Sequence, residues 1–198
     1  MCRQPCYRRR DLPVACGSTL AATPCFRIST ARGCVGYEIK NRGFTGFAAG
    51  GKKGLWFSHT QPDDWRLVLV ESAIDALSYA ALFPDAEDHT RYASLGGRPS
   101  SRQMGLVRAT IVKLPAGAEV VAAFDADAAG RSLAEGIRQV VANIANAIDM
   151  GELAFEARLP VKEGEDWNKV LQDVSFRSVT NNSRIGSHLA LPKTQPVG

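Results

Sequence analysis

The spacing of hydrophobic positions changes along the chain and divides it into two patterned parts. From residue 66 onward, short apolar runs such as RLVLVE alternate with stretches in which apolar residues recur at helical spacing. These patterns predict strands over 66–71, 91–97, 119–125 and 154–160, and helices over 72–83, 99–114, 128–148 and 166–172. Continuous apolar runs are typical of strands buried on both faces, and helical crossovers of this length join parallel strands. Residues 66–173 are therefore expected to form an α/β domain with a parallel sheet and flanking helices.

The part before residue 66 has a different pattern. VGYEIK, FTGFA and GLWFS are short runs of strand-forming residues separated by turns that contain glycine, which predicts a small antiparallel β meander over 35–60. Residues 1–34 are basic, contain all five cysteines and show no sustained period, so they are expected to be irregular. The periodicity disappears again near the end, and 174–198 is expected to be a loose tail.

Composition and cysteine usage narrow the class of protein. The 198 residues suffice for one domain with a core, and 45% of them are hydrophobic, as in globular proteins. No stretch reaches the roughly 18 consecutive apolar residues of a membrane span, and the basic N-terminus has no apolar segment of the kind that secretory signals carry. A cytoplasmic protein without a membrane partner is expected. The cysteines are odd in number and form no Cys-x2-Cys pair, which argues against a disulfide framework and a zinc ribbon.

Charge is distributed unevenly along the chain. Residues 1–60 carry a net charge of +8, residues 61–175 carry −7 and residues 176–198 carry +3. A basic segment joined to an acidic domain suggests that the first binds a polyanion and the second binds a metal. The alternative is a basic segment that is only solvated.

Four acidic residues stand at or just after the predicted strands. Glu71 ends the first strand, Asp125 and Asp127 end the third, and Asp166 follows the fourth. Ligands gather at the carboxyl ends of parallel strands, so these carboxylates are expected to lie at one edge of the sheet. Oxygen ligands alone favour Mg²⁺ or Mn²⁺ over zinc. Glu71 also has a purely structural interpretation as an acid at a helix N-terminus, and Asp166 as a helix N-cap. For Asp125 and Asp127 the alternative is that they only end a strand. Asp75 is either an ordinary first-turn acid or a residue that supports the others.

These motifs carry a family resemblance. LVLVESAIDALS, YASLGG, VVAAFDADAAGRS and EDWNKVL, in this order, resemble the Toprim domain shared by topoisomerases, bacterial primases and some nucleases. The resemblance covers residues 66–173 and implies a Rossmann-like parallel sheet. It implies that Glu71 is a metal ligand or general acid/base and that Asp125 and Asp127 hold Mg²⁺, with Mn²⁺ as the other candidate ion. By the same resemblance Asp166 completes or supports the site.

The basic strands before this domain extend the resemblance. GYEIKNRGFTGFAAGGKKGLWFS is similar to the segment that precedes Toprim in replicative primases, and the closest likeness is to Toprim proteins of plasmids and other mobile elements. The resemblance implies single-stranded DNA and nucleoside triphosphates as partners. It also implies replication or mobilisation proteins of a mobile element as further partners. Lys52 and Lys53 lie in a glycine-rich turn, and Arg98 and Arg131 follow predicted strand ends, so these four are candidate nucleotide- and DNA-binding residues. A plain hairpin turn is the alternative for the lysines.

Three functions remain open at this point. The first hypothesis is a Mg²⁺-dependent, primase-like nucleotidyltransferase that acts on single-stranded DNA. The second is a Toprim nuclease that uses the same carboxylates to cleave phosphodiesters. The third is a catalytically idle DNA-binding remnant of a mobile-element protein, because the zinc and helicase modules of complete primases are not recognisable. Phosphatases of the haloacid dehalogenase type are disfavoured, since Ala129 stands where they place Thr or Val and their Asp-x-Asp motif follows the first strand.

Overall fold

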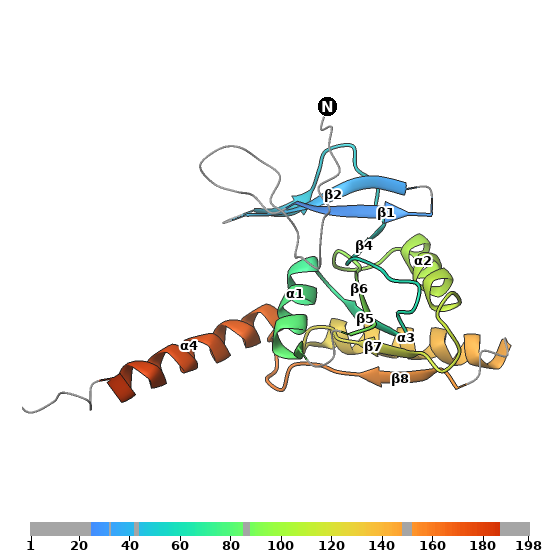
Figure 1. Ribbon diagram of the computed structural model, residues 1–198. Helices are drawn as coiled ribbons and strands as arrows, with labels where there is room; N and C mark the ends of the chain where they lie inside the picture. The colour runs from blue at the N-terminus through green and yellow to red at the C-terminus, as the bar shows by residue number, and fades with distance from the viewer. Residues whose placement is uncertain (1–24, 32, 42–43, 85–87, 148–151, 187–198) are drawn as a thin grey trace, which may run out of the picture.

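The computed structural model describes residues 25–31, 33–41, 44–84, 88–147 and 152–186, which form one mixed sheet with helices on both faces (Figure 1). The strands are β1 (Cys25–Thr30), β2 (Gly33–Asn41), β3 (Phe44–Phe47), β4 (Leu55–Phe57), β5 (Arg66–Val70), β6 (Thr90–Ser94), β7 (Glu119–Ala122) and β8 (Ala154–Ala157). The helices are α1 (Ala73–Leu82), α2 (Ser101–Ile111), α3 (Ala128–Ala147) and α4 (Trp167–Gly186). The order of strands across the sheet is β3-β2-β1-β4-β6-β5-β7-β8.

The strands β6, β5, β7 and β8 are parallel and form the α/β part of the fold. β5 lies between β6 and β7 and is buried on both faces, as its continuous apolar run predicts. Leu67 and Leu69 pack in the cluster that includes α2 and α3, whereas Val68 and Val70 pack in the cluster that includes α1 and the first residues of α4. The expected α/β class, with a parallel sheet and flanking helices, is confirmed.

Local sequence determines where α1 and α2 begin. The Ser72 hydroxyl caps α1 by accepting the backbone N–H of Asp75, and Ser100 with Gln103 forms a reciprocal capping box at α2. Because Ser72 caps a helix that starts three residues after β5, Glu71 is held at the junction between strand and helix. The cap of α1 therefore fixes one of the predicted site residues.

The N-terminal strands correct the sequence-based expectation in two ways. Residues 25–34, expected to be irregular, contain β1 and the start of β2, and Phe26 and Ile28 of β1 are almost fully buried. β1 lies between β2 and β4, so the strands over 35–60 are not a separate meander. β4 continues the sheet by pairing with β6 in antiparallel fashion. The alternation in CFRIST is only two buried positions long, which is too short to stand out among cysteines and arginines. Residues 1–24 lie outside the described residues.

The C-terminal part also differs from its prediction. Residues 174–186, expected to belong to a loose tail, continue α4, which projects beyond α1 in Figure 1. No proline or glycine interrupts this stretch before Gly186, so a helix can propagate although its apolar periodicity is weak. The remainder of the predicted tail lies outside the described residues. Within the described ranges, no helix combines the length and the apolar character needed to cross a membrane.

Gln103 joins the two halves of the sheet from α2. Its side chain is buried, and its Nε2 donates to the backbone oxygens of Gly54, before β4, and Leu95, after β6, at 2.9 and 2.6 Å. We expect Gln103→Leu to lower the free energy of unfolding by about 2 kcal/mol, because two buried carbonyls lose their donor. Urea denaturation measures this loss. The exposed Gln139→Leu on α3 is the matched control and should change stability by less than about 0.5 kcal/mol; equal effects of the two changes would contradict the prediction.

Candidate active site

A cleft of about 430 Å³ lies where the carboxyl ends of the parallel strands face β2 and β3. The acids that line it are Glu38, Glu71, Asp75, Asp125 and Asp166. The strands β2 and β3 supply Glu38, Lys40 and Phe47, and Asp75 comes from the first turn of α1. The other acids come from the junctions after β5 and β7 and before α4. The structure thus brings three separate junctions of the parallel sheet to one cleft, as the sequence predicts for this edge.

Glu71, Asp75, Asp125 and Asp166 line one side of the cleft, which we call the acidic wall. Glu71 and Asp125 form its centre. The carbonyl of Glu71 accepts the N–H of Gly97 at 3.0 Å, which ties the end of β5 to the loop after β6. Two carboxylate oxygens, Glu71 Oε1 and Asp125 Oδ1, are buried and have no hydrogen-bond partner. Buried polar atoms in folded proteins are nearly always paired, and an unpaired carboxylate oxygen is costly. These two oxygens are therefore the strongest indication of a ligand site.

The electrostatics of this wall oppose ionisation. Burial raises the pKa of Asp125 to about 7, and the negative charges of Glu71, Asp75, Asp166 and Asp127 add to the rise. Burial also raises the pKa of Glu71. The backbone N–H of Asp125 opposes this rise, because its hydrogen bond favours the charged form of the carboxyl. A cluster of carboxyls in this state gains free energy when a cation binds beside it.

Asp127 and Asp166 make local contacts with the helices that follow them. The Asp127 carboxylate accepts the N–H of Gly130 at 2.7 Å in the first turn of α3, and the Asp166 carboxylate accepts the N–H of Lys169 at 2.6 Å in the first turn of α4. Asp166 lines the cleft, because Trp167 Nε1 donates to the carbonyl of Ala123 at 3.0 Å and holds the start of α4 against the end of β7. Their expected roles as metal ligands stay predictions.

Asp75 lies one helical turn beyond Glu71 and is buried, with 6% of its surface exposed. Its carboxylate accepts a hydrogen bond from the Ser72 hydroxyl at 2.5 Å. Burial raises the pKa of Asp75, and the bond from Ser72 opposes that rise. Asp75 therefore adds negative charge to the cleft while one of its oxygens is paired, which agrees with a supporting residue.

The donor set was tested for its fit to a divalent cation. Among the residues that the structure describes, no three or more His, Cys, Asp or Glu side chains converge closely enough to hold a metal ion, so the expected set of four acids is not a closed cage. The cleft offers instead two unpartnered oxygens, from Glu71 and Asp125. Mg²⁺ usually takes one or two protein carboxylates and completes its octahedron with waters and substrate phosphates. The residues present fit that pattern.

The four predicted basic residues lie outside the lining of the cleft. Lys52, Lys53 and Arg98 are exposed, and the Lys53 ammonium donates to the carbonyl of Arg98 at 3.3 Å, so the glycine-rich turn touches the loop after β6. Arg131 forms a two-bond ion pair with Glu163, at 2.8 and 2.9 Å. The contact from Lys53 brings two of the predicted cations together, whereas Arg131 is engaged elsewhere.

Three cleft residues escaped the sequence reasoning: Glu38, Lys40 and Phe47. Lys40 lies 3.4 Å from Glu38, in the same strand, and Phe47 is the cross-strand partner of Glu38. One signal was available, because Glu38 is one of only two acids in the first 60 residues. The predicted meander implies the pairing of β2 with β3, but the sequence does not tell which face of these two strands lines the cleft.

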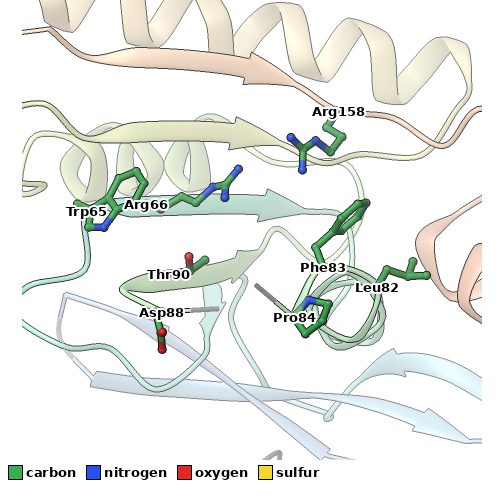
Figure 2. A pocket seen from close by; sticks show the side chains of 8 residues that line it. All are labelled: Trp65, Arg66, Leu82, Phe83, Pro84, Asp88, Thr90 and Arg158. Atoms are coloured by element: carbon green, nitrogen blue, oxygen red, sulfur yellow. The ribbon is translucent and has the colours of Figure 1, made fainter. Parts of the chain in front are cut away.

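A second cavity, of about 390 Å³, lies at the start of β5 and β6 (Figure 2). It contains none of the predicted site residues; its lining comprises Trp65, Arg66, Leu82, Phe83, Pro84, Asp88, Thr90 and Arg158. Arg66 is paired with Glu119 at 2.9 Å, and Arg158 is paired with Glu156 and donates to the Tyr79 hydroxyl at 2.9 Å. Its cations are thus neutralised by acids of the same chain, which is typical of a structural network.

One family model and several solved structures are similar to this chain. The family model described as Toprim-like matches residues 68–171. Among solved structures, the chain is similar to a DNA primase domain from Pseudomonas aeruginosa (19% identity over 79% of this chain and 49% of that chain, TM-score 0.43). It is also similar to the E. coli primase catalytic core (19% identity over 76% of this chain and 48% of that chain, TM-score 0.43). A third similar structure is the DnaG primase catalytic domain bound to single-stranded DNA (16% identity over 81% of this chain and 52% of that chain, TM-score 0.42). The chain spans about half the length of these structures. No curated protein matches it.

The family match covers more than half of the chain and runs from β5 into α4. That segment places Glu71, Asp125 and Asp166 at the cleft. The resemblance drawn from the order of the sequence motifs is therefore confirmed at the level of the family. This chain belongs to the Toprim-like family.

Proposed function

We propose that this chain is a Mg²⁺-dependent, primase-like nucleotidyltransferase that uses nucleoside triphosphates and acts on single-stranded DNA. The observation that carries the proposal is the pair of buried, unpartnered oxygens, Glu71 Oε1 and Asp125 Oδ1, at the carboxyl ends of parallel strands. The Toprim resemblance implies phosphoryl-transfer chemistry at this edge. Carboxylates kept at a cost to stability are typical of such sites.

The acidic wall would bind and orient the reacting groups. A divalent cation bound there would supply charge neutralisation on the phosphate oxygens and orient the attacking and leaving oxygens. Glu71 and Asp125 would hold that ion through their unpartnered oxygens. The pKa of Glu71, raised by burial, also suits a carboxyl that takes up the proton of an attacking hydroxyl. Asp75, fixed by Ser72, would maintain the negative potential behind them.

The basic residues would hold the nucleic acid. Lys40 lines the cleft, and Arg98 directly follows Gly97, which also lines it. Lys52 and Lys53 reach the same loop through the contact with Arg98. Cations of this kind contact phosphates and position a strand without reading its bases. Arg131 would contribute only after its pair with Glu163 opens.

A single gel assay tests the proposal against both alternatives. Purified protein is incubated with single-stranded DNA, labelled nucleoside triphosphates and Mg²⁺ or Mn²⁺, alongside Asp125→Ala, Glu71→Gln and the exposed control Glu135→Gln on α3. We expect labelled oligomers from the wild type and the control, and none from the two site variants. Shortened DNA that depends on Asp125 would establish the nuclease instead. Salt-sensitive DNA binding without any product would establish the idle remnant.

A further inference from the structure

Glu38 is a buried acid on the wall of the cleft opposite Glu71 and Asp125. Its side chain is 4% exposed, although it belongs to the most basic part of the chain. One oxygen, Oε1, lies 3.4 Å from the Lys40 ammonium, and the other, Oε2, is buried without a hydrogen-bond partner. Burial raises the pKa of Glu38, and the Lys40 ammonium and the backbone N–H of Ala73 oppose that rise. Within the described part of the chain, Oε2 still has no hydrogen-bond donor.

The surroundings of Glu38 indicate what kind of group its Oε2 would accept. A carboxylate oxygen binds a cation or accepts from an O–H or N–H, and Glu38 already has the Lys40 ammonium as its cation, which leaves Oε2 for a hydrogen-bond donor. Phe47, directly across from Glu38 in β3, lines the same cleft, is 38% exposed and has its ring beside Gly96. A cleft of about 430 Å³ has the size of a small-molecule site. A ring for stacking, an acceptor and an acidic phosphate-transfer edge together suit a nucleotide.

We propose that Glu38 is a specificity-determining residue whose Oε2 accepts a hydrogen bond from the bound nucleotide, either from the 2′-hydroxyl of the sugar or from an N–H of the base. This inference rests on the proposed function, because it places the nucleotide in the cleft of Glu71 and Asp125. A buried acceptor left unpaired penalises any substrate that lacks the donor. Glu38 would thus decide which nucleotide binds, without taking part in the transfer.

Equilibrium binding tests the inference independently of catalysis. The four ribonucleoside and the four deoxyribonucleoside triphosphates are titrated by calorimetry with Mg²⁺ into the wild-type chain, Glu38→Met and Glu38→Gln. We expect the wild type to prefer nucleotides that carry the donor by at least about tenfold, and Glu38→Met to reduce that preference to within about threefold. Glu38→Gln keeps one acceptor without the charge and should be intermediate. Lys40, whose side chain is 23% exposed, can turn to water in both variants.

The comparison of nucleotides separates the sources of the donor. A ribose-to-deoxyribose difference that disappears in Glu38→Met assigns the bond to a sugar hydroxyl, and a difference among bases that disappears assigns it to the base. The matched control Glu135→Met, on the exposed surface of α3, should keep the wild-type preferences. If Glu38 only stabilised β2, Glu38→Met would weaken the binding of all eight nucleotides equally, and the inference would be wrong.

Failure of the inference and failure of the proposed function give different results. Nucleotide binding with a Glu38-dependent preference, but without labelled product in the gel assay, would remove the transferase proposal and keep the role of Glu38. Product formation by a wild type that binds all eight nucleotides with equal affinity would keep the transferase proposal and remove the role of Glu38. That second result needs no variant, so it stands even if Glu38→Met fails to fold.

Discussion

Asp125→Asn is expected to lower nucleotidyl transfer by a factor on the order of 10³ while making the metal-free fold more stable at pH 8. The activity falls because the substitution removes one of the two carboxylates with an unpartnered oxygen at the acidic wall. The stability rises because asparagine has nearly the same shape but cannot ionise. Loss of function together with a gain in stability is the signature of a residue kept for chemistry rather than for folding.

The stability gain should depend on pH with a definite sign. The pKa of Asp125 is raised from 3.8 to about 7 by burial and then by Glu71, Asp75, Asp166 and Asp127. The contribution of the protonated Asp125 carboxyl to the stability of the fold is therefore fully present below about pH 4, and it is lost as the pH rises through about 7. The asparagine of Asp125→Asn cannot ionise, so the variant does not lose this contribution at pH 8. There we expect its free energy of unfolding to exceed that of the wild type by roughly 1 to 2 kcal/mol after allowance for solvent screening.

Urea denaturation in the presence of a chelator, at pH 5 and pH 8, measures this difference. The advantage of Asp125→Asn over the wild type should be larger at pH 8 than at pH 5. Added Mg²⁺ should stabilise the wild type by mass action and should have a smaller effect on the variant. An advantage that is absent at pH 8, or that is equal at both pH values, would show that the acidic wall does not oppose ionisation as argued here.

The sequence carried most information where burial is continuous. RLVLV of β5 is apolar at every position after Arg66, so the strand, its burial on both faces and the acid at its end could all be predicted. The order of the motifs then led to the Toprim-like family, which the family model confirms. Strong local patterns of this kind need no knowledge of distant partners, because one segment of chain contains the whole signal.

The remainder of the fold depends on pairings between distant segments. β1 inserts between β2 and β4, and this order is set by the registers of three strands rather than by any one of them. Glu38 reaches the cleft from β2, and the meander predicted for this segment does not tell which of its faces lines the cleft. A helix N-cap was the predicted alternative for Asp166 but not for Asp127, and both carboxylates accept a backbone N–H in the first turn of the helix that follows. Asp166 also lines the cleft, which shows that a capping carboxylate can belong to the site.

Gly130→Ala is expected to damage the site through the backbone. Gly130 lies in the first turn of α3, where a methyl group would overlap the backbone carbonyl oxygen of Asp125. Backbone atoms cannot turn aside as the end of a flexible side chain can, so either Asp125 or the start of α3 must shift. We expect a loss of about 3 kcal/mol in the free energy of unfolding, near the upper end of overpacking costs, and a fall in nucleotidyl transfer of about 100-fold.

The same helix supplies the control. At Gly136 a methyl group would meet no atom within 4 Å, so Gly136→Ala should stabilise the fold by about 0.5 to 1 kcal/mol through its higher helix propensity and leave activity unchanged. Both variants make the same chemical change in α3, and only their distance from Asp125 differs. Denaturation and the gel assay on the pair therefore separate contact with Asp125 from helix propensity. Equal responses at Gly130 and Gly136 would mean that the approach of α3 to Asp125 does not position the site, and that the placement of Asp125 must come from β7 alone.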